Sequence, residues 1–83
     1  MSIEKTLRSF ILENFLFTDD ESALANDDSF LERGIVDSTG IMEVITFIEE
    51  KYGFAVANDE MVPENLDSVE SLVGFVSRKQ AAE

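Results

Sequence analysis

The stretch GIVDSTG, residues 34–40, holds the residues of this chain that are best placed to do chemistry. Asp37 and Ser38 stand directly before an amphipathic helical pattern. Either residue can cap a helix, because its side-chain oxygen accepts a hydrogen bond from a free backbone N–H, which is worth about 1 kcal/mol. Capping does not explain Thr39 and Gly40, since glycine costs about 1 kcal/mol relative to alanine inside a helix. We therefore expect something to approach or lie along the helix beside Ser38.

A hydrolytic role for Ser38 is not supported by the residues around it. Val36 stands where the nucleophile motif G-x-S-x-G has its first glycine, and the chain has no His to act as a base. The aspartic-protease signature is not matched either, because two residues separate Asp37 from Gly40. The chain also has no Cys, which excludes disulfides and thiolate metal sites. We expect no catalytic residue, and the protein is not predicted to be an enzyme by itself.

Carboxylates are dense in DDESALANDDSFLE, residues 19–32. This run lacks the central glycine and the alternating ligands of a calcium-binding loop, so we expect a solvated acidic loop and no metal site. Over the whole chain, 18 Asp and Glu against 6 Lys and Arg leave a formal net charge of −12. Such a charge repels nucleic acid and anionic lipid and attracts basic protein surfaces. It is equally compatible with a plain solubilising role.

The length of 83 residues indicates one domain, residues 1–83, with a compact helical core. The N-terminal residues have charges within every apolar run, unlike a signal peptide. No stretch approaches the roughly 20 apolar residues that cross a bilayer. We expect a cytoplasmic monomer without a membrane span.

Apolar spacing predicts two long helices in the first two thirds of the chain. The first has Ser2 as its N-cap, ends near Thr18, and carries one apolar stripe: Ile3, Leu7, Phe10, Ile11 and Phe17. The second ends at Gly53, a left-handed cap, and carries the cleanest stripe: Ile41, Val44, Ile45, Ile48 and Tyr52. A long first loop, residues 18–37, joins them and should pack down through its apolar residues: Leu24, Phe30, Leu31 and Ile35.

The last third of the chain predicts a short helix and a longer one. Pro63 can open a helical turn, because proline is tolerated in the first turn. The last helix starts near Asp67, which has capping-box spacing with Glu70, and carries a stripe of Val69, Leu72, Val73 and Val76. No strand pattern is strong. The sequence thus predicts an all-α fold, a small four-helix bundle of three main helices and a short third helix, with a long first loop.

The stretch GIVDSTGIMEVITFIEEKYGF, residues 34–54, closely resembles the Asp-Ser region and second helix of the acyl and peptidyl carrier proteins. The resemblance extends over nearly the whole chain, through the acidic composition, the long first loop and the short third helix. In that family the serine carries 4′-phosphopantetheine, taken from coenzyme A, whose thiol holds an acyl or aminoacyl group as a thioester. The four residues Asp-Ser-Thr-Gly are similar to those of stand-alone carriers paired with separate ligases, and to the Asp-Ser-Met-Gly of D-alanyl carriers.

The resemblance assigns roles to particular residues. Ser38 matches the serine that carries the prosthetic group, and Asp37 matches the acidic residue before it, with a role in capping or in transferase recognition. Four residues match positions where helix two of the family meets partner enzymes or where this chain departs from its relatives: Thr39, Met42, Glu43 and Glu49. The implied partners are a phosphopantetheinyl transferase, an acyl- or aminoacyl-activating adenylating ligase, and a downstream acyltransferase or synthase.

Two other functions remain open from the sequence. An acidic helical module could dock a basic protein partner without any prosthetic group, and a phosphoserine-regulated adaptor could use Ser38 as its phosphorylation site. The cargo of a carrier is also open among fatty acyl, amino acyl and aryl groups, with the DSTG resemblance favouring an amino acid or small acid. The apolar residues favour a closed core over one that sequesters a chain.

Overall fold

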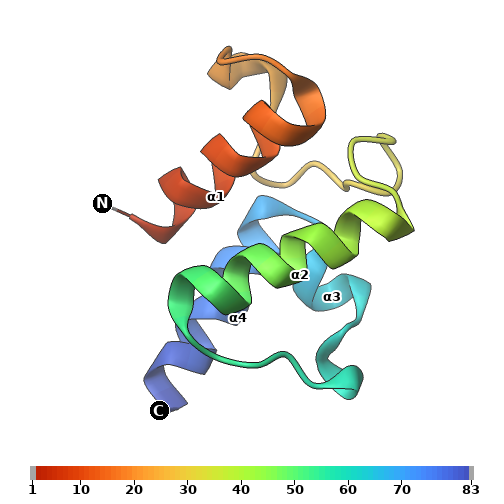
Figure 1. The fold of residues 1–83 in the computed structure, drawn as a ribbon. Helices are drawn as coiled ribbons and strands as arrows, with labels where there is room; N and C mark the ends of the chain where they lie inside the picture. The colour runs from red at the N-terminus through yellow and green to blue at the C-terminus, as the bar shows by residue number, and fades with distance from the viewer. Residues whose placement is uncertain (1, 83) are drawn as a thin grey trace.

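The computed structural model describes residues 2–82, which form four α-helices and no strand (Figure 1). The helices are α1 (Ile3–Ile11), α2 (Ser38–Tyr52), α3 (Pro63–Leu66) and α4 (Val69–Ala82). Short turns interrupt the connections: a π-helical turn at Leu12–Leu16 and 3₁₀ turns at Glu21–Ala23 and Asn58–Glu60. The predicted all-α bundle, with its short third helix and its long first loop, is confirmed.

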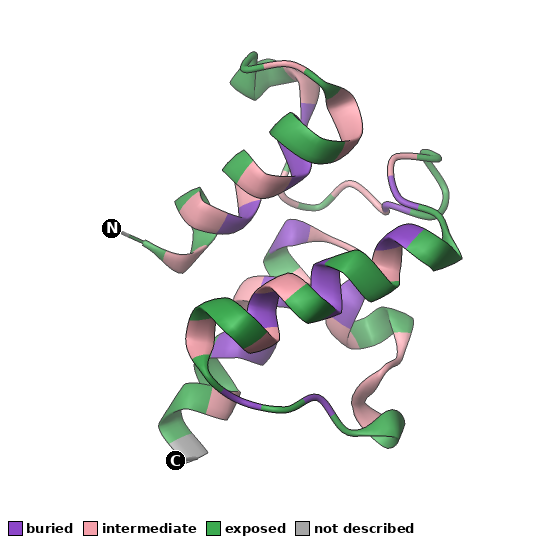
Figure 2. Cartoon of the chain, viewed as in Figure 1, coloured by how far each residue is buried: buried purple, intermediate pink, exposed green. Residues whose placement is uncertain are grey.

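The core lies where α1, α2 and α3 pack around α4 (Figures 1 and 2). The helical stripes supply most of it, and the predicted stripe of α2 is buried at Val44, Ile45 and Ile48. The remaining buried apolar residues are Leu7, Ile11, Leu12, Leu24, Phe30, Val36, Phe54, Val56, Leu66, Val69, Leu72, Phe75 and Val76. Every helix therefore contributes to one cluster, and no described charged side chain is buried in it.

Two of the predicted helix caps are formed. Ser2 Oγ accepts a hydrogen bond from the backbone N–H of Lys5 at 3.0 Å, which caps α1. Gly53 ends α2 with a φ of 74°, and its N–H donates to the carbonyl of Glu49 at 2.9 Å. A left-handed residue at this position satisfies a carbonyl that the helix would otherwise leave free.

The first helix does not continue to residue 17 as a regular α-helix. It widens into the π-helical turn, at the end of which the Thr18 N–H donates to the carbonyl of Leu12 at 3.1 Å. A wider turn rotates the following side chains away from a stripe spaced at 3.6 residues. Phe17 ends this turn with a φ of 55° and is 83% exposed. The prediction that Phe17 belongs to the core stripe is wrong for this reason.

The long first loop packs down through fewer apolar residues than expected. Leu24 and Phe30 are buried and Ile35 is half-buried, as predicted. Leu31 is 48% exposed, so the prediction that it packs the loop against the core is wrong. The backbone at Phe30 and Leu31 is instead held by hydrogen bonds to Asp67, which leaves the Leu31 side chain at the surface.

Asp67 connects this loop to the junction of α3 and α4. Its carboxylate accepts hydrogen bonds from the Ser29 hydroxyl and from the Leu31 N–H, the latter at 3.0 Å. Its backbone carbonyl accepts from the Phe30 N–H at 2.8 Å. Asp67 is therefore not the cap of α4, and the prediction of a capping box with Glu70 is wrong. Ser68 replaces it, since its Oγ accepts from the N–H of Ser71 at 3.1 Å.

Substitution of Asp67 tests this connection. Asp67→Ala leaves two donors of the loop without their acceptor, and we expect a loss of about 2 kcal/mol in the free energy of unfolding, because hydrogen bonds to charged groups are worth about 1.5–3 kcal/mol. Urea denaturation followed by circular dichroism measures this loss. Asp27→Ala is the matched control, since Asp27 is exposed in the same loop and its carboxylate makes no hydrogen bond to a described residue. Equal losses in the two variants would contradict the assignment.

Candidate functional site

Asp37 caps α2, and Ser38 is the first residue of the helix. The Asp37 carboxylate accepts a hydrogen bond from the Gly40 N–H at 2.7 Å, and its backbone carbonyl accepts from the Ile41 N–H at 2.9 Å. The sequence left open which of the two residues would cap. Because Asp37 does so, the Ser38 hydroxyl is not needed for capping.

Ser38 is exposed, and its hydroxyl makes no hydrogen bond to another residue within 2–82. The first turn of α2 contains no acidic residue. The positive end of the helix dipole at Ser38 is therefore offset only by the capping carboxylate of Asp37. A negatively charged group on the hydroxyl would gain about 0.3–1 kcal/mol from this dipole. The hydroxyl is thus accessible and electrostatically suited to carry an anionic group.

Gly40 is buried, which changes the interpretation of this residue. A Cβ atom on Gly40 would lie 2.8 Å from Cε1 of Phe15, 2.9 Å from Cγ1 of Val36 and 3.3 Å from Oδ1 of Asp37. The group that lies along the helix is therefore the chain's own π-helical turn and loop. The expectation that Gly40 is bare to admit something from outside is not supported by this packing. Gly40 instead lets Phe15 and Val36 fix the start of α2.

Alanine substitutions at two helical glycines test this packing. Gly40→Ala gains helix propensity of about 1 kcal/mol but overpacks the contact with Phe15 and Val36, which typically costs about 1–3 kcal/mol. We expect a net loss of about 1 kcal/mol in unfolding free energy by urea denaturation. Gly74→Ala in α4 is the control, since its Cβ would meet only the tip of Arg78 at 3.4 Å, and we expect it to stabilise the protein.

A double variant separates packing from backbone effects. In a Phe15→Ala background, the cost of Gly40→Ala should fall by more than 0.5 kcal/mol, as expected for coupled neighbours. Stabilisation by Gly40→Ala in the wild-type background, or additivity with Phe15→Ala, would contradict the contact.

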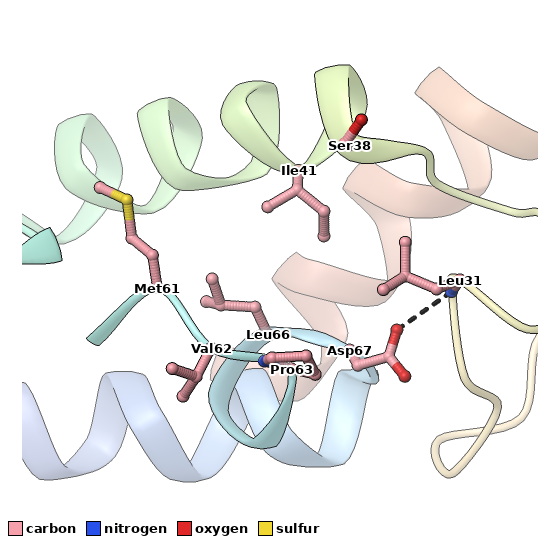
Figure 3. Close-up of a pocket in the computed structure, with 8 residues that line it drawn as sticks. All are labelled: Leu31, Ser38, Ile41, Met61, Val62, Pro63, Leu66 and Asp67. Atoms are coloured by element: carbon pink, nitrogen blue, oxygen red, sulfur yellow. Dashed lines mark hydrogen bonds between the residues drawn. The ribbon is translucent and has the colours of Figure 1, made fainter. Parts of the chain in front are cut away.

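An apolar pocket of about 190 Å³ opens beside Ser38 (Figure 3). Ser38 and Ile41 of α2 form one side, and Leu31 of the long loop forms the end next to Asp67. The opposite side comes from the segment leading into and through α3: Met61, Val62, Pro63 and Leu66. The sequence did not predict that this side belongs to the site. The sequence feature that could have indicated it is the apolar pair before Pro63, Met61 and Val62. This pair is far from Ser38 in the sequence, so the spacing of residues could not place it beside Ser38.

Of the four residues predicted to meet partners, three line one groove and the fourth does not. Thr39, Met42 and Glu43 lie together on the outer face of α2, and Met42 is 54% exposed. Glu49 is half-buried, and its Oε2 accepts a hydrogen bond from the Val56 N–H at 2.8 Å. Glu49 therefore holds the chain that follows α2, and substitutions there would disturb the structure as well as any partner contact.

In the acidic loop, residues 19–32, a carboxylate accepts hydrogen bonds from a nearby residue of the same loop. Asp20 caps the 3₁₀ turn by accepting from the hydroxyl of Ser22 at 2.6 Å and from its N–H at 3.0 Å, and these hydrogen bonds lower the pKa of Asp20. Within residues 2–82, no group of three or more acidic side chains is arranged to hold a metal ion. No helix in the described part of the chain is long and apolar enough to cross a membrane.

Comparisons with known proteins identify relatives of this chain. It is 32% identical to the D-alanyl carrier protein of Abiotrophia defectiva over 56 residues, which are 68% of this chain and 71% of that protein. It is 28% identical to the probable acyl carrier protein PigG of Serratia sp. over 79 residues, 95% of this chain and 90% of that protein. No protein-family model matches it.

A solved structure supports the same relationship. The solution NMR structure of a holo acyl carrier protein from Nitrosomonas europaea superposes with a TM-score of 0.76 and 28% identity, covering 98% of this chain and 99% of that one. The fold, the exposed serine at the start of α2 and these relatives together define the class. The chain belongs to the family of carrier proteins that includes the D-alanyl and acyl carrier proteins. The predicted resemblance is confirmed, and the protein is a non-enzymatic carrier.

Proposed function

We propose that this carrier protein holds an acyl or aminoacyl group as a thioester on a 4′-phosphopantetheine arm attached to Ser38, and delivers it between partner enzymes. The observation that carries the proposal is the state of Ser38. Its hydroxyl is exposed and free of hydrogen bonds to the described residues, at the first position of α2. The arm supplies the thiol that a chain without Cys does not have.

The residues around Ser38 fit such a group. The phosphate would lie at a helix N-terminus whose first turn contains no acid, and the apolar pocket beside Ser38 offers a surface for the uncharged part of the arm. The chain has no His, and the Asp37 carboxylate caps the helix through the Gly40 N–H without a hydrogen bond to the Ser38 hydroxyl. The catalytic groups for attachment then have to come from the transferase, and Asp37 contributes the geometry that this enzyme recognises.

The closed core favours a small cargo. The core of the bundle is closed by large apolar side chains, among them Phe30, Leu72 and Ile48, which are inaccessible to solvent. A long acyl chain would have to displace such residues to enter the core, whereas a small group at the end of the arm needs no room there. We therefore favour an amino acid or a small acid, activated by an adenylating ligase and passed to an acyltransferase or synthase.

Intact-mass measurement tests the attachment site. After incubation with coenzyme A, Mg²⁺ and a broad-specificity phosphopantetheinyl transferase, wild-type protein should gain one phosphopantetheine and Ser38→Ala should gain none. Ser77→Ala, at another exposed serine, is the control and should be modified like wild type. Circular dichroism of Ser38→Ala establishes that the variant is folded. An unmodified wild type, or equal modification of Ser38→Ala, would refute the proposal and leave an unmodified docking module as the better explanation.

Charge reversal at Glu43 tests how the carrier meets the transferase. Glu43 is exposed next to Met42 on α2, and its side chain makes no hydrogen bond or ion pair with the described residues. We expect Glu43→Lys to lower the kcat/KM of modification several-fold at low salt, because it removes an attraction for a basic partner surface. The effect should shrink as salt increases, since exposed charges are screened.

The control for this measurement is Glu4→Lys, which makes the same change in net charge at an exposed position in the first turn of α1. Equal effects in the two variants, or an effect of Glu43→Lys that persists unchanged in high salt, would count against electrostatic docking on α2.

A further inference from the structure

Helices α1 and α2 contact each other through two aromatic rings. Phe10 of α1 stacks on Phe47 of α2, with ring centroids 4.0 Å apart and planes inclined by 16°. Both rings are half-buried, and a surface groove opens on each side of the stack. The two phenylalanines thus form an apolar platform that divides this face of the molecule into two parts.

The groove nearer Ser38 is acidic. It has a volume of about 480 Å³, and Thr39, Met42 and Glu43 line it together with Glu50. None of its lining residues is basic. Met42 adds an exposed, unbranched apolar side chain next to the platform. We call this the acidic groove.

The groove on the other side of the stack is basic. It has a volume of about 300 Å³ and is lined by Lys5 and Lys51, with Glu13 as its one acidic residue. Neither lysine side chain makes an ion pair or a hydrogen bond with a residue in the described part of the chain. We call this the basic groove.

The position of these lysines is unexpected in so acidic a chain. The other four basic side chains are committed within the fold: Arg8, Arg33 and Lys79 form ion pairs, and Arg78 donates to Asn65. Lys5 and Lys51 instead line the same groove, although like charges repel. In a protein with a net charge of −12, this placement makes one face negative at the end near Ser38 and positive at the other end.

We propose that the face between α1 and α2 docks an amphipathic helix of a partner protein in one orientation. An apolar residue of that helix lies over the Phe10–Phe47 platform. A basic residue at one end faces Glu43 and Glu50 in the acidic groove, and an acidic residue at the other end faces Lys5 and Lys51 in the basic groove. Helices commonly bind such grooves through apolar anchors on one face.

This arrangement predicts a different partner from the one that net charge alone would attract. A net charge of −12 favours a partner that is basic throughout, whereas the basic groove would repel the far end of such a partner. The division of charge thus selects both the partner and its direction, with the partner's basic end next to Ser38. The proposal does not depend on whether Ser38 is modified.

Paramagnetic NMR with a designed peptide tests the orientation. The probe is a short helical peptide with Glu in its first turn, Leu and Phe at its centre and Lys in its last turn, an order of charge that also favours the helix. Isotope-labelled protein is titrated with the peptide carrying a spin label at either end. A label at the Lys end should broaden the amide signals of Thr39, Met42 and Glu43, and a label at the Glu end should broaden those of Thr6 and Ser9. A reversed pattern, broadening on another face, or no localised change would overturn the proposal.

Two variants distinguish the effect of the basic groove on peptide binding from the effect of net charge. Lys5→Glu keeps a residue that suits the first turn of α1, and it should weaken binding of the peptide by about 2- to 5-fold, as for the loss of one exposed ion pair. Arg78→Glu on α4 makes the same change in net charge and should bind the peptide like wild type. Equal affinities for the two variants would overturn the proposal, because the groove would then have no part in binding.

Discussion

The packing of Phe15 and Val36 against Gly40 fixes the start of α2, and the site depends on this contact. Any side chain at Gly40 would bring its Cβ within 3 Å of both residues. Phe15 reaches Gly40 from the π-helical turn that follows α1, so the irregular end of α1 and the bare position in α2 belong to one arrangement. The chain gives up about 1 kcal/mol of helix propensity at Gly40 and gains tight packing at the helix start.

This contact determines what Asp37 and Ser38 can do. With the start of the helix held in place, the Asp37 carboxylate reaches the Gly40 N–H and caps the helix, and the neighbouring hydroxyl is left exposed. Asp67 positions the other wall of the site, because it ties the loop at Leu31 to the end of α3. The attachment residue that we propose, Ser38, therefore lies between a rigid cap and an apolar pocket.

Several polar side chains near the ends of the helices stabilise the fold. Glu49 binds the backbone after α2 through Val56. Glu60 accepts hydrogen bonds from the Ala57 N–H and from Lys79, and these interactions lower the pKa of Glu60. Ser38 differs from them because its hydroxyl has no such role. A free hydroxyl at a fixed position is what a modifying enzyme requires, since it can be reached without disturbing the core.

Local signals in the sequence were sufficient for the helices and their simpler ends. The buried stripe of α2, the Ser2 cap and the left-handed Gly53 all follow from residues within one or two turns of each other. The π-helical turn was not predictable, because apolar spacing assumes a regular helix, and Phe17 was misplaced as a result. Asp67 looked like a cap and instead binds a loop far away in the chain.

Only part of the site was predicted, because only part of it is formed by residues that are neighbours in the sequence. Ser38 and Asp37 could be singled out from adjacent residues and from the family resemblance. The role of Gly40 depends on Phe15, and the pocket depends on residues that follow α2, such as Met61. Both are contacts between distant parts of the chain, which spacing within a helix does not reveal.

Peptide mapping of the modified protein tests the central claim most directly. Trypsin cleaves after Arg33 and Lys51, so Ser38 lies in the peptide of residues 34–51, together with Thr39 and Thr46 as the other hydroxyl residues. Fragmentation of this peptide after treatment with coenzyme A and a transferase should place a single phosphopantetheine on Ser38. Its presence on another residue or another peptide would contradict the claim that the start of α2 presents Ser38 as the attachment site.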